Sequence, residues 1–338
     1  MGCNQLGCTA FVVPNPGWLH QPMIKKPLSI PSGPALLAIS GGRDSVALLQ
    51  WLISAGYKKL ILCHLNHGLR GRESGQDAAF VRRLATRYGL KCEIRKADAA
   101  AHARQHHLSV ETAGRELRHA FLFEMARKHR AKSVFMAHHA DDQAETILAN
   151  LCRGASLRGV GGMLKITPLK RGNQRLIIQR PFLDWRRADI AAYVQEHRLT
   201  FREDSSNLSL QYRRNRLRHE VLPLLDDIFN RDVAANIARF GQHAQLDDLA
   251  LWQMAQEHFP KLLASDNSLI ITPELCLERP AILSRIIHFW LLQILKLKAI
   301  DSDIIESAMT MLRLGGPAKI NLPGALHLRR KAKRLWVE

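Results

Sequence analysis

The first part of the chain alternates between short apolar runs and longer stretches in which apolar residues recur with helical spacing. Strands are expected at 35–39, 59–65, 91–97 and 133–139. Helices are expected between them, at 44–54, 73–89 and 109–129. This alternation predicts a doubly wound α/β fold, in which a parallel sheet carries helices on both faces.

After about residue 215 the pattern becomes mostly helical. Residues 230–259 are expected to form one long helix, and the apolar segment 286–295 to form a buried helix. Residues 318–338 are expected to form strands joined by a turn at Pro323 and Gly324. The second part of the chain is therefore predicted to be a separate, mainly helical domain.

Three segments follow from these patterns. Residues 1–34 contain six prolines and no sustained apolar stretch, so they are expected to be a loose extension. Residues 35–220 are expected to form the α/β domain. Residues 221–338 are expected to form the mainly helical domain, which ends in a strand pair.

Basic residues exceed acidic residues by a wide margin. The chain contains 49 Lys and Arg against 30 Asp and Glu, a formal net charge of +19. This excess favours a protein that binds a polyanion such as nucleic acid, and a basic surface without such a partner is the alternative. No apolar run approaches the roughly 18 residues that a spanning helix needs, so no membrane partner is expected.

The six cysteines are scattered along the chain. No two of them form a Cys-x-x-Cys pair, which argues against a zinc ribbon and against an iron–sulfur pattern. Scattered thiols in a chain without an export signal indicate a reducing cytoplasm.

The turn after the first predicted strand reads Ser-Gly-Gly-Arg-Asp-Ser over residues 40–45. A glycine-rich turn that leads into a helix directs backbone N–H groups and the helix N-terminus at an anion. Ser40 and Ser45 add hydroxyl donors, and Asp44 could hold a magnesium ion that bridges phosphates. The lysine of a nucleoside-triphosphatase P-loop is absent. A turn without a ligand is the alternative.

This turn resembles the PP-loop of the ATP pyrophosphatases. The resemblance implies an adenine nucleotide alpha hydrolase-like fold and cleavage of ATP between its α- and β-phosphates. Pyrophosphate then leaves, and AMP passes to an acceptor oxygen. The residues assigned to ATP are Ser40, Gly41, Gly42, Arg43, Asp44 and Ser45.

Three further stretches narrow the resemblance. Residues 64–74 contain His-x-Asn-His-x-Leu-Arg, residues 136–163 contain His-His-x-Asp-Asp-x-x-Glu-Thr, and residues 204–225 contain Arg-Asn-x-Leu-Arg. With the loop at 40–45, these patterns resemble those of the tRNA(Ile)-lysidine synthetases and occur in the same order.

That resemblance implies a ligase that uses ATP and Mg²⁺ and acts on tRNA. Members of the family adenylate C2 of the wobble cytidine in a tRNA(Ile) with a CAU anticodon. The ε-amino group of free L-lysine then displaces AMP and gives lysidine. The resemblance leaves open whether the chain forms a homodimer.

The carboxylates of the second motif are expected at the N-terminus of a helix. Asp141, Asp142 and Glu145 are spaced so that they share one patch there. Such a patch can bind a metal or a substrate ammonium, or it can simply complement the helix dipole. The resemblance assigns Asp142 and Glu145 to the lysine substrate. Asp141 and Asp44 are the metal candidates.

His138 and His139 end a predicted strand at the sheet edge where α/β proteins bind ligands. Either could accept a proton, or could have a structural role, and His138 is the catalytic candidate beside Asp44. In the third motif Arg214, Asn215 and Arg218 match the family pattern, and the two arginines are assigned to the substrate. A solvated basic face is the alternative for these arginines.

Residues 111–121 resemble the family's Glu-x-x-Ala-Arg-x-x-Arg-Tyr. Arg115 and Arg118 are present, whereas Gly114 and His119 replace the alanine and the tyrosine. Arg115 is the third catalytic candidate, because negative charge that develops at the α-phosphate requires fixed cations.

Rival functions differ in what they require. A PP-loop tRNA cytidine thiolase commonly needs paired cysteines, and an amidating synthetase of the GMP or asparagine type would not need the basic excess. A catalytically dead tRNA-binding protein would not need Ser40, Asp44, Ser45 or the carboxylate patch. ATP–pyrophosphate exchange discriminates the dead protein from the enzymes.

Overall fold

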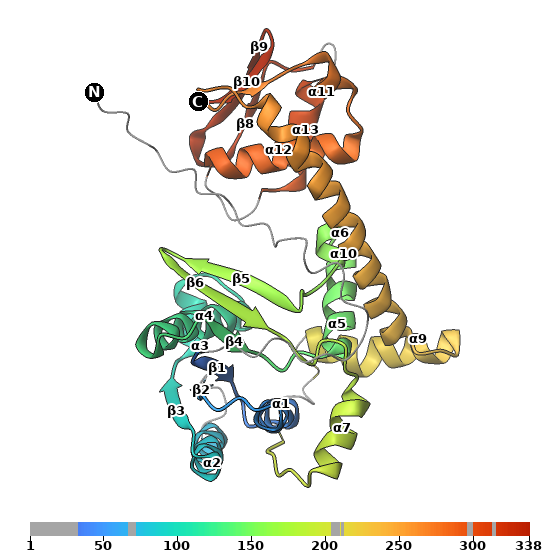
Figure 1. Ribbon diagram of the computed structural model, residues 1–338. Helices are drawn as coiled ribbons and strands as arrows, with labels where there is room; N and C mark the ends of the chain where they lie inside the picture. The colour runs from blue at the N-terminus through green and yellow to red at the C-terminus, as the bar shows by residue number, and fades with distance from the viewer. Residues whose placement is uncertain (1–32, 67–71, 204–209, 211–212, 296–299, 313–315) are drawn as a thin grey trace, which may run out of the picture. The chain divides into compact units, whose positions relative to one another are not determined.

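The computed structural model describes residues 33–66, 72–203, 210, 213–295, 300–312 and 316–338 (Figure 1). Nearly all of the predicted extension, the middle of the motif at 64–74 and most of the start of the motif at 204–225 lie outside the described residues. The chain forms two compact units. Unit 1 comprises Met1–His139 and Leu164–Asp204, and unit 2 comprises Ala140–Met163 and Ser205–Glu338.

Unit 1 is built on a six-stranded sheet. Its strands are β1 (Ala35–Ala38), β2 (Leu60–Asn66), β3 (Lys91–Lys96), β4 (Ser133–Phe135), β5 (Ile166–Arg171) and β6 (Gln174–Gln179). Their order is β3-β2-β1-β4-β6-β5, and every neighbouring pair is parallel except β5 and β6. The four predicted strands are confirmed, although β4 ends earlier than expected. The antiparallel hairpin of β5 and β6 was not predicted.

Helices cover both faces of this sheet, as predicted. They are α1 (Arg43–Ser54), α2 (Arg72–Tyr88), α3 (Ala99–Gln105), α4 (Val110–His129) and α7 (Arg187–Glu196). Successive side chains of a strand point to opposite faces, so Leu37 joins one core with α1, α2 and α7. Leu36 joins a second core with α4. The two cores explain why β1 is apolar at every position.

Unit 2 is mainly helical and ends in a small sheet. Its longer helices are α5 (Ala140–Leu151), α9 (Leu222–Phe229), α10 (Val233–His258), α12 (Pro280–Leu295) and α13 (Ser302–Met311). Its short helical segments are α6 (Leu157–Val160), α8 (Arg213–Arg216), η3 (Leu217–Val221), η4 (Phe259–Leu262), α11 (Pro273–Leu277) and η5 (Pro323–Ala325). Its strands are β7 (Leu269–Ile270), β8 (Lys319–Asn321), β9 (His327–Lys331) and β10 (Arg334–Val337).

The long helix expected at 230–259 is confirmed as α10. A strand pair was expected at the C-terminal end, and the structure has three strands there, β8, β9 and β10. Strand β7 joins them in a sheet of order β7-β10-β9-β8. Gly324 has φ +78° in the turn between β8 and β9, a backbone conformation that suits glycine. In the part of the chain that the structure describes, no helix has both the length and the apolar character needed to cross a membrane.

Helices α5 and α6 cluster with unit 2, although the predicted division at residue 220 assigns them to the α/β domain. The apolar stripe of α5 packs within unit 2. Ala144 packs with Leu222 and Ala234, and Ile147 contacts α10 closely at Gly241. A Cβ at residue 241 would lie 2.4 Å from Ile147 Cδ1, so the helices approach this closely because residue 241 is glycine.

Candidate functional site

The loop predicted to bind ATP lies at the switch point of the sheet in unit 1. β2 and β4 flank β1 on opposite sides, and all three strands run parallel. Ligands of open α/β sheets bind at the carboxyl ends of the strands where the strand order reverses. The segment after β1 and the segment after β4 meet there, because His139 Nε2 lies 3.7 Å from Asp44 Oδ2. His139 is buried.

The loop itself gathers donors at the start of α1. The backbone N–H of Gly41 donates to Ser45 Oγ at 3.2 Å, and that of Gly42 donates to Ser40 Oγ at 3.2 Å. Ser45 Oγ donates to the carbonyl of Gly42 at 2.9 Å. Gly41 has φ +92°, a conformation that L-residues rarely adopt. Two amides, two hydroxyls and a helix N-terminus in one turn can bind a polyphosphate.

Hydrogen bonds made by Arg202, called the brace below, hold this turn in place, and they were not predicted from the sequence. The backbone N–H of Arg202 donates to the carbonyl of Gly41 at 3.0 Å. The Arg202 side chain donates from Nε to Asp77 Oδ1 at 2.6 Å and from Nη2 to Gln76 Oε1 at 2.9 Å. In a trans peptide the C=O and N–H point in opposite directions, so this bond directs the N–H of Gly42 into the turn. Asp77 and Arg202 are 125 residues apart and belong to no quoted motif pattern.

A second residue that was not predicted, Arg180, contacts the catalytic candidate His138. Arg180 is 7% exposed and donates from Nε to His138 Nδ1 at 3.2 Å. Its Nη1 donates to the carbonyl of Leu164 at 2.7 Å and to Thr167 Oγ1 at 2.8 Å. Burial, and then the positive charge of Arg115, lower the pKa of Arg180 to about 10. Only the β5–β6 hairpin, which the sequence pattern did not reveal, brings Arg180 to this position.

His119, which replaces the family's tyrosine, stands among the same cations. Burial, and then the charges of Arg115, Arg118 and Arg180, lower the pKa of His119 to about 4. The ring is therefore neutral near pH 7. His119 can fill the place of an aromatic side chain without adding positive charge.

This pKa shift predicts acid sensitivity. The unfolded chain protonates His119 below its ordinary pKa of about 6.5, whereas the folded chain does so only near 4. Between those values the unfolded state binds more protons, so the free energy of unfolding falls as the pH falls. We expect the free energy of unfolding to fall between pH 7 and pH 5 by roughly 1 kcal/mol less in His119→Tyr than in the wild type, with solvent screening of the partly exposed ring taken into account. Urea unfolding at both pH values measures it, and an equal loss in both proteins would contradict the shift.

The four predicted substrate-binding residues lie together in unit 2. α5 presents Asp142 and Glu145 on one face, and Arg214 on α8 and Arg218 on η3 pair with both carboxylates. Arg214 binds Asp142 Oδ1 at 2.8 Å through Nη2 and Glu145 Oε2 at 2.6 Å through Nε. Arg218 binds Asp142 Oδ1 at 3.0 Å through Nη2 and Glu145 Oε1 at 2.6 Å through Nε. Glu145 is 2% exposed, and the neighbouring Asn215 is also buried.

The two metal candidates belong to different units. Asp44 belongs to unit 1 and Asp141 to unit 2. Among the described residues, no group of three or more His, Cys, Asp and Glu side chains is arranged to hold a metal. Magnesium that arrives with a nucleotide takes most of its ligands from phosphates and water, so a single carboxylate such as Asp44 fits that role. Both metal assignments remain predictions.

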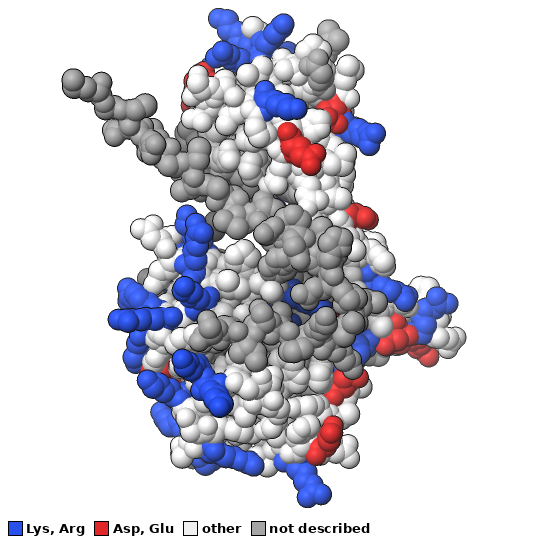
Figure 2. All heavy atoms as spheres, in the orientation of Figure 1, with Lys and Arg blue, Asp and Glu red and all other residues white. Residues whose placement is uncertain are grey.

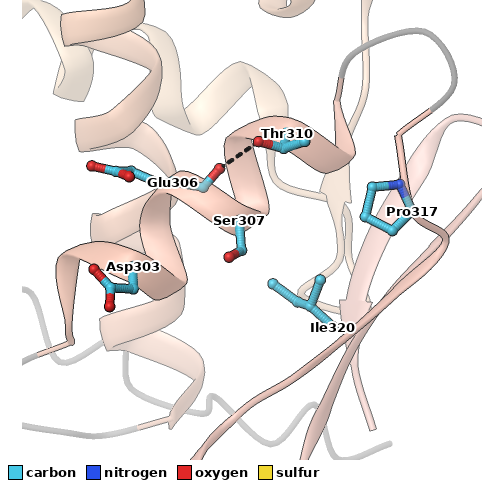
Figure 3. A pocket seen from close by; sticks show the side chains of 6 residues that line it. All are labelled: Asp303, Glu306, Ser307, Thr310, Pro317 and Ile320. Carbon is cyan, nitrogen blue, oxygen red and sulfur yellow. Dashed lines mark hydrogen bonds between the residues drawn. The ribbon is translucent and has the colours of Figure 1, made fainter.

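A hollow of about 370 Å³ in unit 2 contains none of the predicted residues (Figure 3). It is lined by Asp303, Glu306, Ser307, Thr310, Pro317 and Ile320. Its two carboxylates, and the absence of Lys and Arg among the described residues that line it, make it unsuited to a phosphate.

Basic side chains gather on the visible surface of each unit (Figure 2). In unit 1 they lie over α4 and the β5–β6 hairpin, which carry exposed Lys and Arg. These residues are Arg115, Arg118, Arg127, Lys128, Lys170, Arg171 and Arg175. In unit 2 they lie at the end of the β9–β10 hairpin, which exposes Lys331, Lys333 and Arg334.

Known proteins resemble this chain at the level of sequence. The tRNA(Ile)-lysidine synthase of Porphyromonas gingivalis is 39% identical over 236 residues, which cover 70% of this chain and 50% of that protein. The tRNA(Ile)-lysidine synthase of Shouchella clausii is 33% identical over 310 residues, which cover 87% of this chain and 65% of that protein. The chain thus spans between half and about two thirds of the length of these curated relatives. The predicted resemblance to this group is confirmed.

Structural similarity is more distant. The U34-tRNA thiolase NcsA of Methanococcus maripaludis matches with a TM-score of 0.49 and 18% identity, over 63% of this chain and 72% of that chain. A family model described as a PP-loop domain matches residues 21–225, more than half of the 338 residues. That match covers the loop at the switch point and the ion-pair cluster, and the chain belongs to the PP-loop domain family.

Proposed function

We propose that the chain acts as a tRNA(Ile)-lysidine synthase. The observation that carries the proposal is the cluster in which Asp142 and Glu145 meet Arg214 and Arg218. These residues come from two sequence motifs of the lysidine synthetases and lie together here, as residues of one substrate site must. The similarity to curated synthases supports the same reading.

The first step would use the loop of unit 1. The C2 carbonyl oxygen of the wobble cytidine attacks the α-phosphate of ATP, the bond to the β-phosphate breaks, and pyrophosphate leaves. The amides of Gly41 and Gly42 and the hydroxyls of Ser40 and Ser45 bind one another in this structure. They would exchange these bonds for bonds to the leaving pyrophosphate. Asp44 would hold the Mg²⁺ that accompanies the nucleotide, which neutralises phosphate charge. Arg115 would stabilise charge at the α-phosphate.

The second step would use the carboxylates of α5. Asp142 and Glu145 would bind the ammonium groups of free L-lysine. The ε-ammonium group must then lose a proton, after which the ε-amino nitrogen attacks C2, the C2–O bond breaks and AMP leaves. Both carboxylates already bind guanidinium groups. Lysine must therefore compete with Arg214 and Arg218, or share the carboxylates with them.

The brace on the loop predicts an effect on nucleotide affinity. We expect Asp77→Asn to weaken ATP binding by about ten-fold, because a charge-assisted bond of about 1.5–3 kcal/mol then no longer anchors Arg202. Calorimetric titration with ATP measures the affinity. Asp98→Asn is the matched control, because Asp98 accepts a hydrogen bond only at the start of α3 among the contacts described. Equal affinity of Asp77→Asn and wild type would contradict the role of the brace.

The basic surfaces predict salt-sensitive binding of tRNA. A chain of net charge +19 that neutralises several phosphates releases their counterions. We expect affinity to fall by about a thousand-fold or more between about 50 and 200 mM salt. Fluorescence anisotropy with labelled tRNA measures it. Affinity that does not change over this range would contradict an electrostatic interface.

One experiment tests the function as a whole. The protein is incubated with ATP, labelled lysine and total tRNA, and the labelled tRNA is identified. Label in the tRNA(Ile) with a CAU anticodon is expected. Activation of tRNA without lysine transfer would favour the thiolase reading, and the absence of any ATP–pyrophosphate exchange would favour a dead tRNA-binding protein. A cytoplasmic location remains a prediction.

A further inference from the structure

We infer that Arg180 fixes the tautomer of His138, and that His138 serves the adenylation step as an Nε2–H hydrogen-bond donor instead of a proton acceptor. This inference rests on the proposed function, because it assigns roles within its first step. Arg180 is a positioning residue in this account. Neither its position nor its role was predicted from the sequence.

The hydrogen bond between the two side chains defines the tautomer. Arg180 Nε lies 3.2 Å from His138 Nδ1. A guanidinium group has donors and no acceptor, so Nδ1 accepts with its lone pair and carries no proton while this bond exists. The single ring proton is then on Nε2.

Arg180 is held so that it cannot easily turn away. It is 7% exposed, and its Nη1 donates to the carbonyl of Leu164 and to Thr167 Oγ1. The backbone N–H of Arg180 donates to the carbonyl of Lys165 at 2.8 Å. These contacts come from the start of the β5–β6 hairpin, so the hairpin fixes the guanidinium against His138.

The surrounding charge suits a neutral donor. Arg115 and Arg118 act with Arg180 on the nearby His119, whose pKa falls to about 4 through burial and these charges. A region of such positive potential favours a negative ligand. A neutral imidazole adds a directed hydrogen bond to that ligand without adding repulsion among the cations.

The chemistry of the first step also calls for a hydrogen-bond donor and not for a proton acceptor. The attacking group is a carbonyl oxygen, which has no proton to lose, so adenylation needs no proton acceptor. Negative charge develops on the α-phosphoryl oxygens as the bond to the leaving pyrophosphate breaks. His138 follows β4, which pairs with β1 beside the loop, and a fixed donor at that edge stabilises this charge.

Two substitutions of His138 separate the two roles. The amide nitrogen of His138→Gln lies near the position of Nε2, and that of His138→Asn lies near the position of Nδ1. We expect His138→Gln to keep the rate of adenylation within about ten-fold of wild type, and His138→Asn to lose about a hundred-fold or more. The rate is measured as AMP-tRNA formation in a single turnover without lysine. Equal loss in both variants would overturn the donor role, because neither amide can accept the proton.

A double-mutant cycle tests Arg180. We expect Arg180→Met to lower the adenylation rate by about 10- to 100-fold with little change in the KM for ATP. In the His138→Gln background the same substitution should cost less than about three-fold, because an amide has no tautomer to fix. Equal costs in the two backgrounds would show that Arg180 acts only through the fold and would overturn the inference.

A second variant covers the case in which Arg180→Met does not fold. Arg180→Lys keeps the buried charge and loses the guanidinium geometry, and the same cycle applies to it. Failure of the proposed function is distinguished from failure of this inference by measuring lysine transfer. Intact adenylation without lysine transfer would overturn the lysidine reaction, and the cycle on His138 and Arg180 would still give its answer.

Discussion

Glu145→Gln is expected to accumulate adenylated tRNA in the presence of lysine. If Asp142 and Glu145 bind the ammonium groups, loss of one charge removes a bond of about 1.5–3 kcal/mol. The KM for lysine should then rise by about one to two orders of magnitude, while ATP is still bound by residues 40–45. Acid-quenched single turnover with labelled ATP, with and without lysine, measures both steps.

The same substitution should lower stability, because Glu145 is 2% exposed and pairs with both Arg214 and Arg218. Breaking a buried ion pair costs about 3–5 kcal/mol, and the lower end applies because the Arg214 side chain is 40% exposed. Glu220→Gln is the matched control, since Glu220 pairs with Arg216 on the surface of the same segment, where ion pairs contribute about 0–1 kcal/mol.

Three outcomes of the Glu145→Gln experiment are distinct. Accumulated AMP-tRNA supports the lysine assignment. Loss of adenylation itself would move Glu145 to a metal site. An unchanged KM for lysine, with activity lowered only in proportion to the folded fraction, would leave the cluster a structural one.

Asp44→Asn is expected to abolish adenylation while the fold stays intact. Asp44 stands at the mouth of the loop, where its Oδ1 lies 3.2 Å from Arg43 Nε and its side chain is 33% exposed. Replacing it changes little packing, so the midpoint of thermal unfolding should stay within a few degrees of wild type. The rate should fall by about a hundred- to a thousand-fold, as for the loss of one group that stabilises the transition state.

Pyrophosphate release in the presence of tRNA measures the Asp44 effect. Asp184→Asn is the matched control in unit 1, because Asp184 pairs with Lys165 and is 46% exposed. Release at a near wild-type rate from Asp44→Asn would remove Asp44 from the catalytic site. Comparable loss in both variants would point to a general effect of removing negative charge from unit 1.

Features that depend on neighbouring residues were accessible from the sequence. Apolar periodicity gave the strands and helices around β1, because burial on one or two faces imposes a period on adjacent positions. The loop at 40–45 is contiguous, so its donors could be identified before any fold was known. Asp142 and Glu145 share a face of α5 for the same local reason.

Pairings across long distances in the sequence were decided only by the tertiary structure. Arg202 braces the loop through Asp77, and Arg180 contacts His138, at separations of 125 and 42 residues. The chain has 49 basic and 30 acidic residues, and periodicity does not say which of them meet. Motif resemblance named the members of the ion-pair cluster without revealing that they bind one another.

The grouping of elements was likewise a tertiary result. The apolar stripe of α5 is visible in the sequence, but any apolar surface could cover it, because the hydrophobic effect is not directional. Gly241 decides the partner by admitting Ile147 to the surface of α10. The β5–β6 hairpin positions Arg180, yet β5 has no buried residue and gives little apolar signal of its own. The sequence alone therefore determined which chemical groups the protein offers, and the tertiary structure determined which of them act together, because contacts between distant residues depend on how whole elements pack.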